Sequence, residues 1–74
     1  MYAEIFRLPI SEKSNLSGKT ITKIGLPKKS LIVAIERDHK FIIHNEDVEL
    51  FSGDKVTVLA HKDQVDKVSK LFSG

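Results

Sequence analysis

Leu31-Ile32-Val33-Ala34-Ile35 is the longest uninterrupted apolar stretch of the chain, and it decides the fold. Alternate side chains of a strand point to opposite faces, so an apolar run without alternation predicts a strand that is buried on both faces. The run is too short for a typical helix, and it lies between Pro27 and the charged triplet Glu36-Arg37-Asp38, which favours a strand. We therefore expect a central strand ending near Arg37, with a packed layer on each side.

Three further strands are predicted around this centre. Residues 2–8 alternate imperfectly, and Pro9 either ends that strand or places it at a sheet edge. Asp38-His39 predicts a two-residue hairpin turn, because both residue types tolerate positive φ, and residues 41–43 then return antiparallel. Residues 55–60 form the last strand, after a turn that contains Gly53.

Two helices are expected to cover this sheet. The first spans roughly residues 17–24, with Ser17 as its N-cap and Gly25 in the left-handed position after its end. The second begins after Asp63 as N-cap and is amphipathic. The order β-α-β-β-β-α predicts an α+β sandwich with a mostly antiparallel sheet and two helices. The predicted core consists of Ile32, Val33, Ala34, Ile35, Ile42, Val56, Val58, Val65, Val68 and Leu71.

Composition narrows the class of protein further. A 74-residue chain without cysteine has no disulfides or thiolate metal sites, and a domain of this size buries little surface alone. Small uncrosslinked domains often gain burial by oligomerising, so we expect a homodimer. The net charge of +2 is too weak to indicate nucleic-acid binding by itself. No apolar run is long enough for a membrane span and no signal peptide is visible, which predicts a cytosolic protein.

Several motifs, in this order and spacing, resemble the TrkA-C domain, the C-terminal half of the RCK regulators of potassium channels and transporters. The resemblance covers nearly the whole chain and identifies residues 1–74 as one TrkA-C-like regulatory domain, either complete or cut from a larger transporter or regulator. The motifs are Leu16-Ser17-Gly18-Lys19-Thr20-Ile21, Leu26-Pro27, Ile32-Val33-Ala34-Ile35-Glu36-Arg37, Ile42-Ile43 and Gly53-Asp54-Lys55-Val56.

This resemblance implies a ligand-sensing regulatory domain of a cation transport system, with potassium as the expected ion. Members of the family commonly dimerise, and a subset binds cyclic di-AMP between two subunits. The implied partners are a second copy and a membrane channel, transporter or antiporter subunit. The implied location is the cytoplasm, at or tethered to the inner face of the cell membrane. No cofactor is implied, and the regulatory ligand would be cyclic di-AMP or another nucleotide or anion.

The resemblance places Ile32, Val33 and Arg37 on the strand that lines the ligand cleft of such members. A planar guanidinium suits phosphate or carboxylate, so Arg37 of each subunit is expected to reach into a cleft at the dimer interface. Replacing Arg37 with alanine should then weaken ligand binding and leave the fold intact. His39 and His44 flank the returning strand and would complete the rim of the cleft.

The chain departs from the family pattern after residue 43. His44, Asn45 and Glu46 stand where a typical member has a proline, a basic residue and a glycine. Asn45 can occupy a left-handed turn position in place of glycine. A carboxylate at Glu46 favours a cation or an uncharged ligand over a phosphate.

Other chemistries are less well supported by the residues. Gly18-Lys19-Thr20 imitates a phosphate-binding loop, but Lys13 stands where that signature needs glycine. The histidines and acids of residues 44–47 have no diagnostic metal-ligand spacing, and no set of nucleophile and base indicates an enzyme. A basic patch could attract nucleic acid, although no exposed aromatics are expected within it. That patch consists of Lys13, Lys19, Lys23, Lys28 and Lys29.

Two alternatives to the ligand sensor remain open from the sequence. One is a structural dimerisation module that holds transporter subunits together without a ligand. The other is a small nucleic-acid-binding domain, whose binding would weaken steeply with salt.

Overall fold

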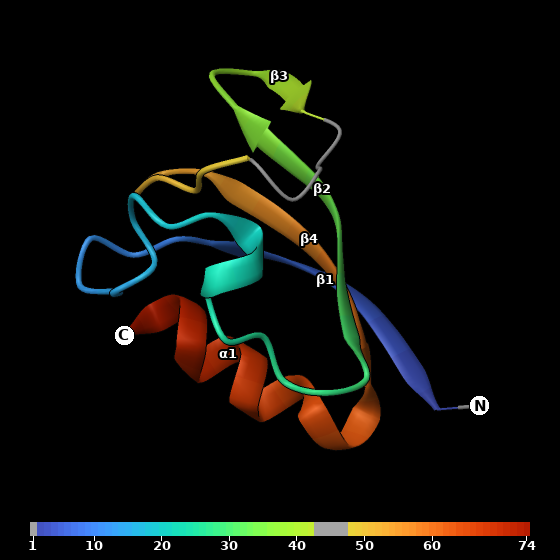
Figure 1. Cartoon of the computed structure of the whole chain (residues 1–74). Helices are drawn as coiled ribbons and strands as arrows, with labels where there is room; N and C mark the ends of the chain where they lie inside the picture. The colour runs from blue at the N-terminus through green and yellow to red at the C-terminus, as the bar shows by residue number, and fades with distance from the viewer. Residues whose placement is uncertain (1, 43–47) are drawn as a thin grey trace.

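The computed structural model describes residues 2–42 and 48–74, and it contains one four-stranded antiparallel sheet (Figure 1). The strands β1 (Ala3–Pro9), β2 (Ser30–Arg37), β3 (Lys40–Ile42) and β4 (Lys55–His61) lie in the order β1-β4-β2-β3. Two 3-10 turns, η1 (Ile21–Lys23) and η2 (Lys62–Gln64), and the helix α1 (Val65–Ser73) complete the elements. The α+β class is confirmed, and β1 is an edge strand as Pro9 predicts.

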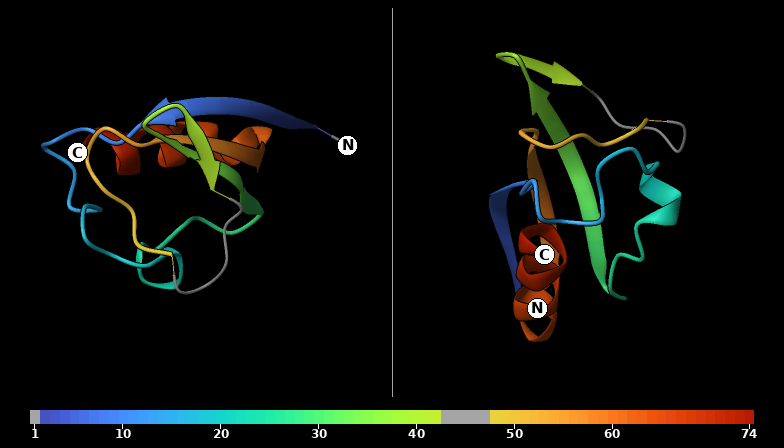
Figure 2. Two further views of the ribbon diagram at one scale, coloured as in Figure 1. Left: turned by 90° about the horizontal axis from the view of Figure 1, so that it is seen from above. Right: turned by 90° about the vertical axis from the view of Figure 1, so that its left-hand side faces the viewer.

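One face of the sheet is covered by α1 and by the crossover segment, which we define as residues 10–29 (Figures 1 and 2). We call this the inner face. The strand register sets its inward-facing side chains next to one another across the strands. Val58 pairs with both Phe6 and Ile32, and Val56 pairs with Ile35. The fully buried apolar side chains form one cluster: Ile10, Leu16, Ile24, Ile32, Ile35, Leu50, Val56, Val58, Ala60, Val68 and Phe72.

The central strand β2 is not buried on both faces within this chain. Ile35 is 0% exposed, whereas Val33 is 45% exposed, so the prediction that Val33 belongs to the core is wrong. The register of β2 against β4 shifts between Ile32 and Ala34, which marks a β-bulge at Val33. Strand alternation after Ile32 turns Val33 away from the core, and the extra residue returns Ile35 to the inner face beside Val56. The side chains of the apolar run therefore lie on both faces of the sheet, with Ile32 and Ile35 in the core and Leu31 and Val33 exposed on the opposite face.

Four other members of the predicted core are only half-buried. Ile42 and Leu71 pack against the buried cluster from its margin, and Ala34 and Val65 are also half-buried. The core positions predicted in β4, in contrast, are confirmed, because the alternation of Val56 and Val58 continues to a buried Ala60. Period-two alternation thus located the core where no bulge interrupts it.

The first predicted helix is reduced to a single 3-10 turn. Only Ile21–Lys23 is helical, and the cap position belongs to Thr20. Ser17 does not cap a helix, because its Oγ instead accepts a hydrogen bond from the backbone N–H of Ser52 at 3.2 Å. Threonine and isoleucine are poor helix formers, and a short segment gains more from pairing with a neighbouring loop. Gly25 has φ of +72°, the left-handed conformation that the sequence predicts.

The C-terminal helix α1 lies close to its predicted position, but it begins differently. Asp63 lies inside η2 and its side chain is not the N-cap of α1, whose cap position is Gln64. His61 caps the 3-10 turn η2, because its Nδ1 accepts a hydrogen bond from the backbone N–H of Asp63 at 3.3 Å. Within the described residues, no helix has the length and apolarity needed to cross a bilayer.

The predicted hairpin at Asp38-His39 is confirmed, and it supplies a stability test. Asp38 and His39 have φ of +52° and +64°. Replacing His39 with glycine should stabilise the chain by about 0.5 kcal/mol, because relief of left-handed strain exceeds the added chain entropy of glycine. Replacing Lys40, the next residue and the first of β3, with glycine should instead destabilise by about 0.5–1 kcal/mol. Urea midpoints that shift in the same direction for both variants would contradict this account.

Candidate functional site

The face of the sheet opposite α1, which we call the outer face, carries uncovered apolar side chains from every strand. Ile5 on β1, Leu31 on β2 and Phe41 on β3 are 69%, 54% and 70% exposed. The strand register aligns two of them, because Leu59 on β4 pairs with Ile5 on one side and with Leu31 on the other. Phe41 pairs with Glu36 near the hairpin end of β2. Large contiguous apolar patches are rare on monomeric proteins and mark interaction surfaces. Together with Val33, these residues define the apolar centre of the outer face.

A charged pair borders this apolar centre. Arg7 on β1 forms an ion pair with Glu36 on β2, across the intervening strand β4. Arg7 is half exposed, so the pair contributes little to stability. It gives the outer face one positive and one negative group at fixed places, which is the kind of feature that orients a partner.

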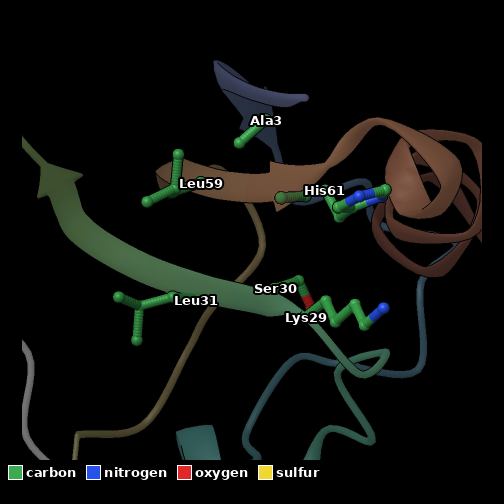
Figure 3. A pocket seen from close by; sticks show the side chains of 7 residues that line it. Ala3, Lys29, Ser30, Leu31, Leu59 and His61 are labelled. Atoms are coloured by element: carbon green, nitrogen blue, oxygen red, sulfur yellow. The ribbon is translucent and has the colours of Figure 1, made fainter. Parts of the chain in front are cut away.

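A hollow of about 390 Å³ opens where β2 begins and β4 ends (Figure 3). Leu31 and Leu59 lie toward one end of it, and Lys29 and His61 lie toward the other. The backbone N–H of His61 donates to the carbonyl of Lys29 at 2.9 Å, which holds this rim together. The hollow therefore combines an aliphatic floor with polar groups at one end, as small-molecule sites commonly do.

A second, smaller hollow of about 200 Å³ lies at the other end of β2. It is lined by the hairpin residues Asp38 and His39, by Glu36, and by Gly53 and Lys55. The lining mixes both signs of charge, and within residues 2–42 and 48–74 no large apolar side chain contributes to it. His39 is exposed at this rim, so its imidazole is accessible to a ligand.

Arg37 is engaged inside the molecule. Its Nε donates to Oδ1 of Asp54 at 2.8 Å and its Nη2 donates to Oδ2 of the same carboxylate at 2.7 Å. Nη2 also donates to the carbonyl of Glu49 at 2.9 Å, and the Phe51 ring centroid lies 4.9 Å from the guanidinium carbon. The hydrogen bond to Asp54 raises the pKa of Arg37, so the guanidinium stays charged at any physiological pH.

Asp54 is the buried partner of this pair. It is 2% exposed, and besides Arg37 its carboxylate accepts from the backbone N–H of Phe51 at 2.9 Å. A two-point guanidinium–carboxylate contact fixes both groups in place. The loop before β4 is thereby tied to the end of β2, and the same loop pairs with the crossover segment through Leu50 and Lys19. The pair therefore has a structural role.

Sequence reasoning did not identify this pair. The sequence predicts that Arg37 reaches into a cleft at the dimer interface, and it shows Asp54 only as part of the motif Gly53-Asp54-Lys55-Val56. Gly53, with φ of +91°, turns the chain so that Asp54 faces inward at the start of β4. A glycine–acid step directly before a strand is the signal that could have suggested a buried carboxylate. The expectation that Arg37 can be removed without loss of stability is revised accordingly.

The four described residues among the five predicted to line a ligand site are divided between different surfaces. The side chain of Ile32 lies in the core, and Val33 lies on the outer face. Arg37 turns toward Asp54 on the inner side, and His39 lies at the rim of the second hollow. His44 lies outside the described residues. Of the predicted set, Val33 and His39 therefore expose side chains away from the core.

The matching family model and the most similar relatives both connect this chain to TrkA proteins. The family described as the TrkA-C domain matches residues 5–73. The Trk system potassium uptake protein TrkA homolog 1 of Methanosarcina mazei is 34% identical over 70 residues, which are 95% of this chain and 16% of that protein. TrkA homolog 2 of the same organism is 33% identical with the same coverage. The chain thus spans only a small part of these relatives.

Solved structures share the fold. The RCK C domain of the potassium transport protein KtrA, in complex with c-di-AMP, has a TM-score of 0.79 and 27% identity over 92% of this chain and 81% of that one. The RCK_C domain dimer of S. agalactiae BusR, also in complex with c-di-AMP, has a TM-score of 0.79 and 25% identity, over 92% of this chain and 93% of that one.

Proposed function

The chain belongs to the TrkA-C domain family, and we propose that it is a ligand-sensing regulatory domain of a potassium transport protein. In this proposal two copies pair through their outer faces and hold a small ligand between them. The observation that carries it is the uncovered apolar centre, to which all four strands contribute an exposed or half-exposed large side chain. Nothing in the described part of the chain covers that surface, so a second molecule is the natural cover.

A second copy is favoured as that cover for two reasons. A small domain without crosslinks gains much of its stability from association. The ion pair of Arg7 and Glu36 borders the apolar centre, and a two-fold axis would place each near its opposite on the other copy. The similar domain of BusR is a dimer, which supports the same arrangement here.

We place the ligand beside β2, toward its hairpin end. Val33 would form an apolar wall on the outer face, and the backbone of Ile32 would contribute polar groups beside it. His39 and His44 would lie at the rim, where an imidazole can donate to a ligand oxygen. Arg37 would act as a positioning residue that holds the hairpin end of β2 against the loop of Asp54. Cyclic di-AMP is the first ligand to test, because similar domains of KtrA and BusR bind it.

One observation favours a second candidate function, a dimerisation module without a ligand. The guanidinium expected to receive an anion is already bound to Asp54 and to the carbonyl of Glu49. A domain whose central arginine stabilises its own fold can hold two subunits of a transport protein together without binding a ligand. The two candidates share the same outer-face dimer and differ only in ligand binding.

Calorimetric titration separates these two candidates. The ligand sensor predicts that cyclic di-AMP binds the wild type more tightly than millimolar, at one ligand for every two chains. Replacing His39 with glutamine should weaken binding by about 3- to 10-fold, the value of one neutral hydrogen bond. Adenine nucleotides and simple anions are titrated in parallel, so that a different ligand of the same chemistry is also found.

His61 provides a matched control, because it is the half-buried histidine at the other hollow of the outer face. The His61→Gln variant should bind cyclic di-AMP as the wild type does. If His61→Gln weakens binding and His39→Gln does not, the ligand occupies the hollow of Figure 3 and our placement is incorrect. If no compound binds the wild type, the structural module becomes the better account.

A further inference from the structure

Basic side chains are concentrated in the segments that cover the inner face. The segments that cover the inner face, residues 11–29 and 62–74, carry eight lysines against three carboxylates, a net charge of +5. The other described residues, 2–10, 30–42 and 48–61, carry four basic side chains against five carboxylates, a net charge of −1. A total charge of +2 conceals this asymmetry. We call the covering side the basic layer. Its lysines, all exposed, are Lys13, Lys19, Lys23, Lys28, Lys62, Lys67 and Lys70. Lys29 is also exposed, but it lines the hollow of Figure 3 on the outer face.

The basic layer is continuous, because one end of the crossover segment is tied to the C-terminal end of α1 and the other end is tied to β4, shortly before α1 begins. At one end the hydroxyl of Ser14 donates to the carbonyl of Leu71 at 3.1 Å. At the other end the backbone N–H of His61 donates to the carbonyl of Lys29 at 2.9 Å. Figure 2 shows α1 and the crossover segment covering the sheet side by side. The lysines of the two segments therefore contribute to one surface.

The lysines of this layer are not committed to other groups of the described structure. The ion pairs found among residues 2–42 and 48–74 use Arg7, Arg37 and His61, and none of them includes a lysine. Both arginines of the chain thus form ion pairs outside the layer, and every basic side chain of the layer is a lysine. Lysine is a mobile point charge without the planar fork that recognises single phosphates or carboxylates with fixed geometry. Such a surface suits diffuse attraction to many negative groups.

The layer also lacks the exposed aromatic side chains on which the bases of a nucleic acid would stack. Its segments contain one aromatic residue, Phe72, and that side chain is 1% exposed, so no base could stack on it. A plane of mobile anionic headgroups needs neither stacking nor fixed geometry. Clusters of four to eight lysines are the pattern that binds such a plane.

We propose that the basic layer docks on an anionic lipid surface. The outer face, on the other side of the sheet, remains available for a second copy while the lysines contact headgroups. The attraction is electrostatic and should decay within a Debye length, about 30 Å at 0.01 M and about 10 Å at 0.1 M ionic strength. Membrane contact by this domain is independent of whether it binds a regulatory ligand.

Co-sedimentation with vesicles tests the proposal. Wild-type protein should bind vesicles of phosphatidylcholine mixed with phosphatidylglycerol, and binding should fall sharply between about 0.01 M and about 0.1 M salt. Vesicles of phosphatidylcholine alone should not retain it. The double variant Lys23→Gln, Lys28→Gln should lose about fivefold in affinity for each lysine, on the order of 25-fold in total.

A second double variant controls for net charge. Lys40→Gln with Lys55→Gln removes the same charge from the hairpin end of the sheet, and its vesicle affinity should stay within a factor of about two of the wild type. Equal losses for the two double variants would overturn the proposal, because net charge alone would explain them. Tighter binding to duplex DNA or to a polyglutamate peptide at the same salt would also overturn it. Circular dichroism confirms that each variant is folded.

Discussion

Replacing Arg37 with alanine is expected to destabilise the domain by about 3–5 kcal/mol, because the substitution leaves the Asp54 carboxylate buried without its counterion. Asp54 is 2% exposed, and among the described residues the backbone N–H of Phe51 would be its one remaining partner in the variant. The loop held by this pair would also lose the contact between Arg37 and the carbonyl of Glu49. Urea unfolding followed by circular dichroism measures the change.

Arg7 supplies the matched control for this prediction. It also forms an ion pair, with Glu36, but the arginine is half exposed, so Arg7→Ala should cost no more than about 1 kcal/mol. Adding Asp54→Ala to Arg37→Ala should recover part of the loss, since the uncompensated charge is then removed. An Arg37→Ala protein as stable as Arg7→Ala would mean that the pair does not hold the fold.

Replacing Val33 with aspartate is expected to abolish the homodimer and to leave the chain folded. Val33 is 45% exposed in one chain, so a carboxylate there meets water in the monomer. In the proposed dimer each substituted residue would bury a charge, which costs several kcal/mol, and two-fold symmetry doubles the cost. Sedimentation velocity across micromolar concentrations should show a dimer for the wild type and a monomer for the variant.

Thr22→Asp is the control for this second prediction, because it adds the same charge at an exposed position in η1, on the covered side of the sheet. It should sediment as the wild type does. A Val33→Asp protein that unfolds would show instead that Val33 is part of the core, as the apolar run alone indicates. A Val33→Asp protein that remains dimeric would move the interface away from the outer face.

The sequence predicted the strands because their signals are local. The run at Leu31–Ile35, the alternation in β4 and the two residues between β2 and β3 each depend on neighbours in the chain. The run predicted burial on both faces, but no local signal says whether the second cover is the same chain or another. The bulge at Val33 is also invisible in the sequence, because it depends on how β2 meets β4.

The candidate site was less predictable for a related reason. Arg37 and Asp54 are 17 residues apart, and only the fold of β2 and β4 brings them together. Without that contact, an arginine after a buried strand resembles a free anion receptor. The prediction of the first helix was wrong for a similar reason. The hydrogen bonds that take the place of helical ones come from residues about 30 positions away, such as Leu50 with Lys19. Long-range pairing overrode local propensity in both places.

The account depends most on the claim that two chains meet through their outer faces. An isotope-filtered NOESY spectrum of a sample that mixes labelled and unlabelled chains tests this directly, because it reports only contacts between different molecules. The account predicts cross-peaks from the methyl groups of Ile5, Leu31, Val33 and Leu59, and none from Val68 in α1. Intermolecular cross-peaks confined to α1 or to the crossover segment would contradict it.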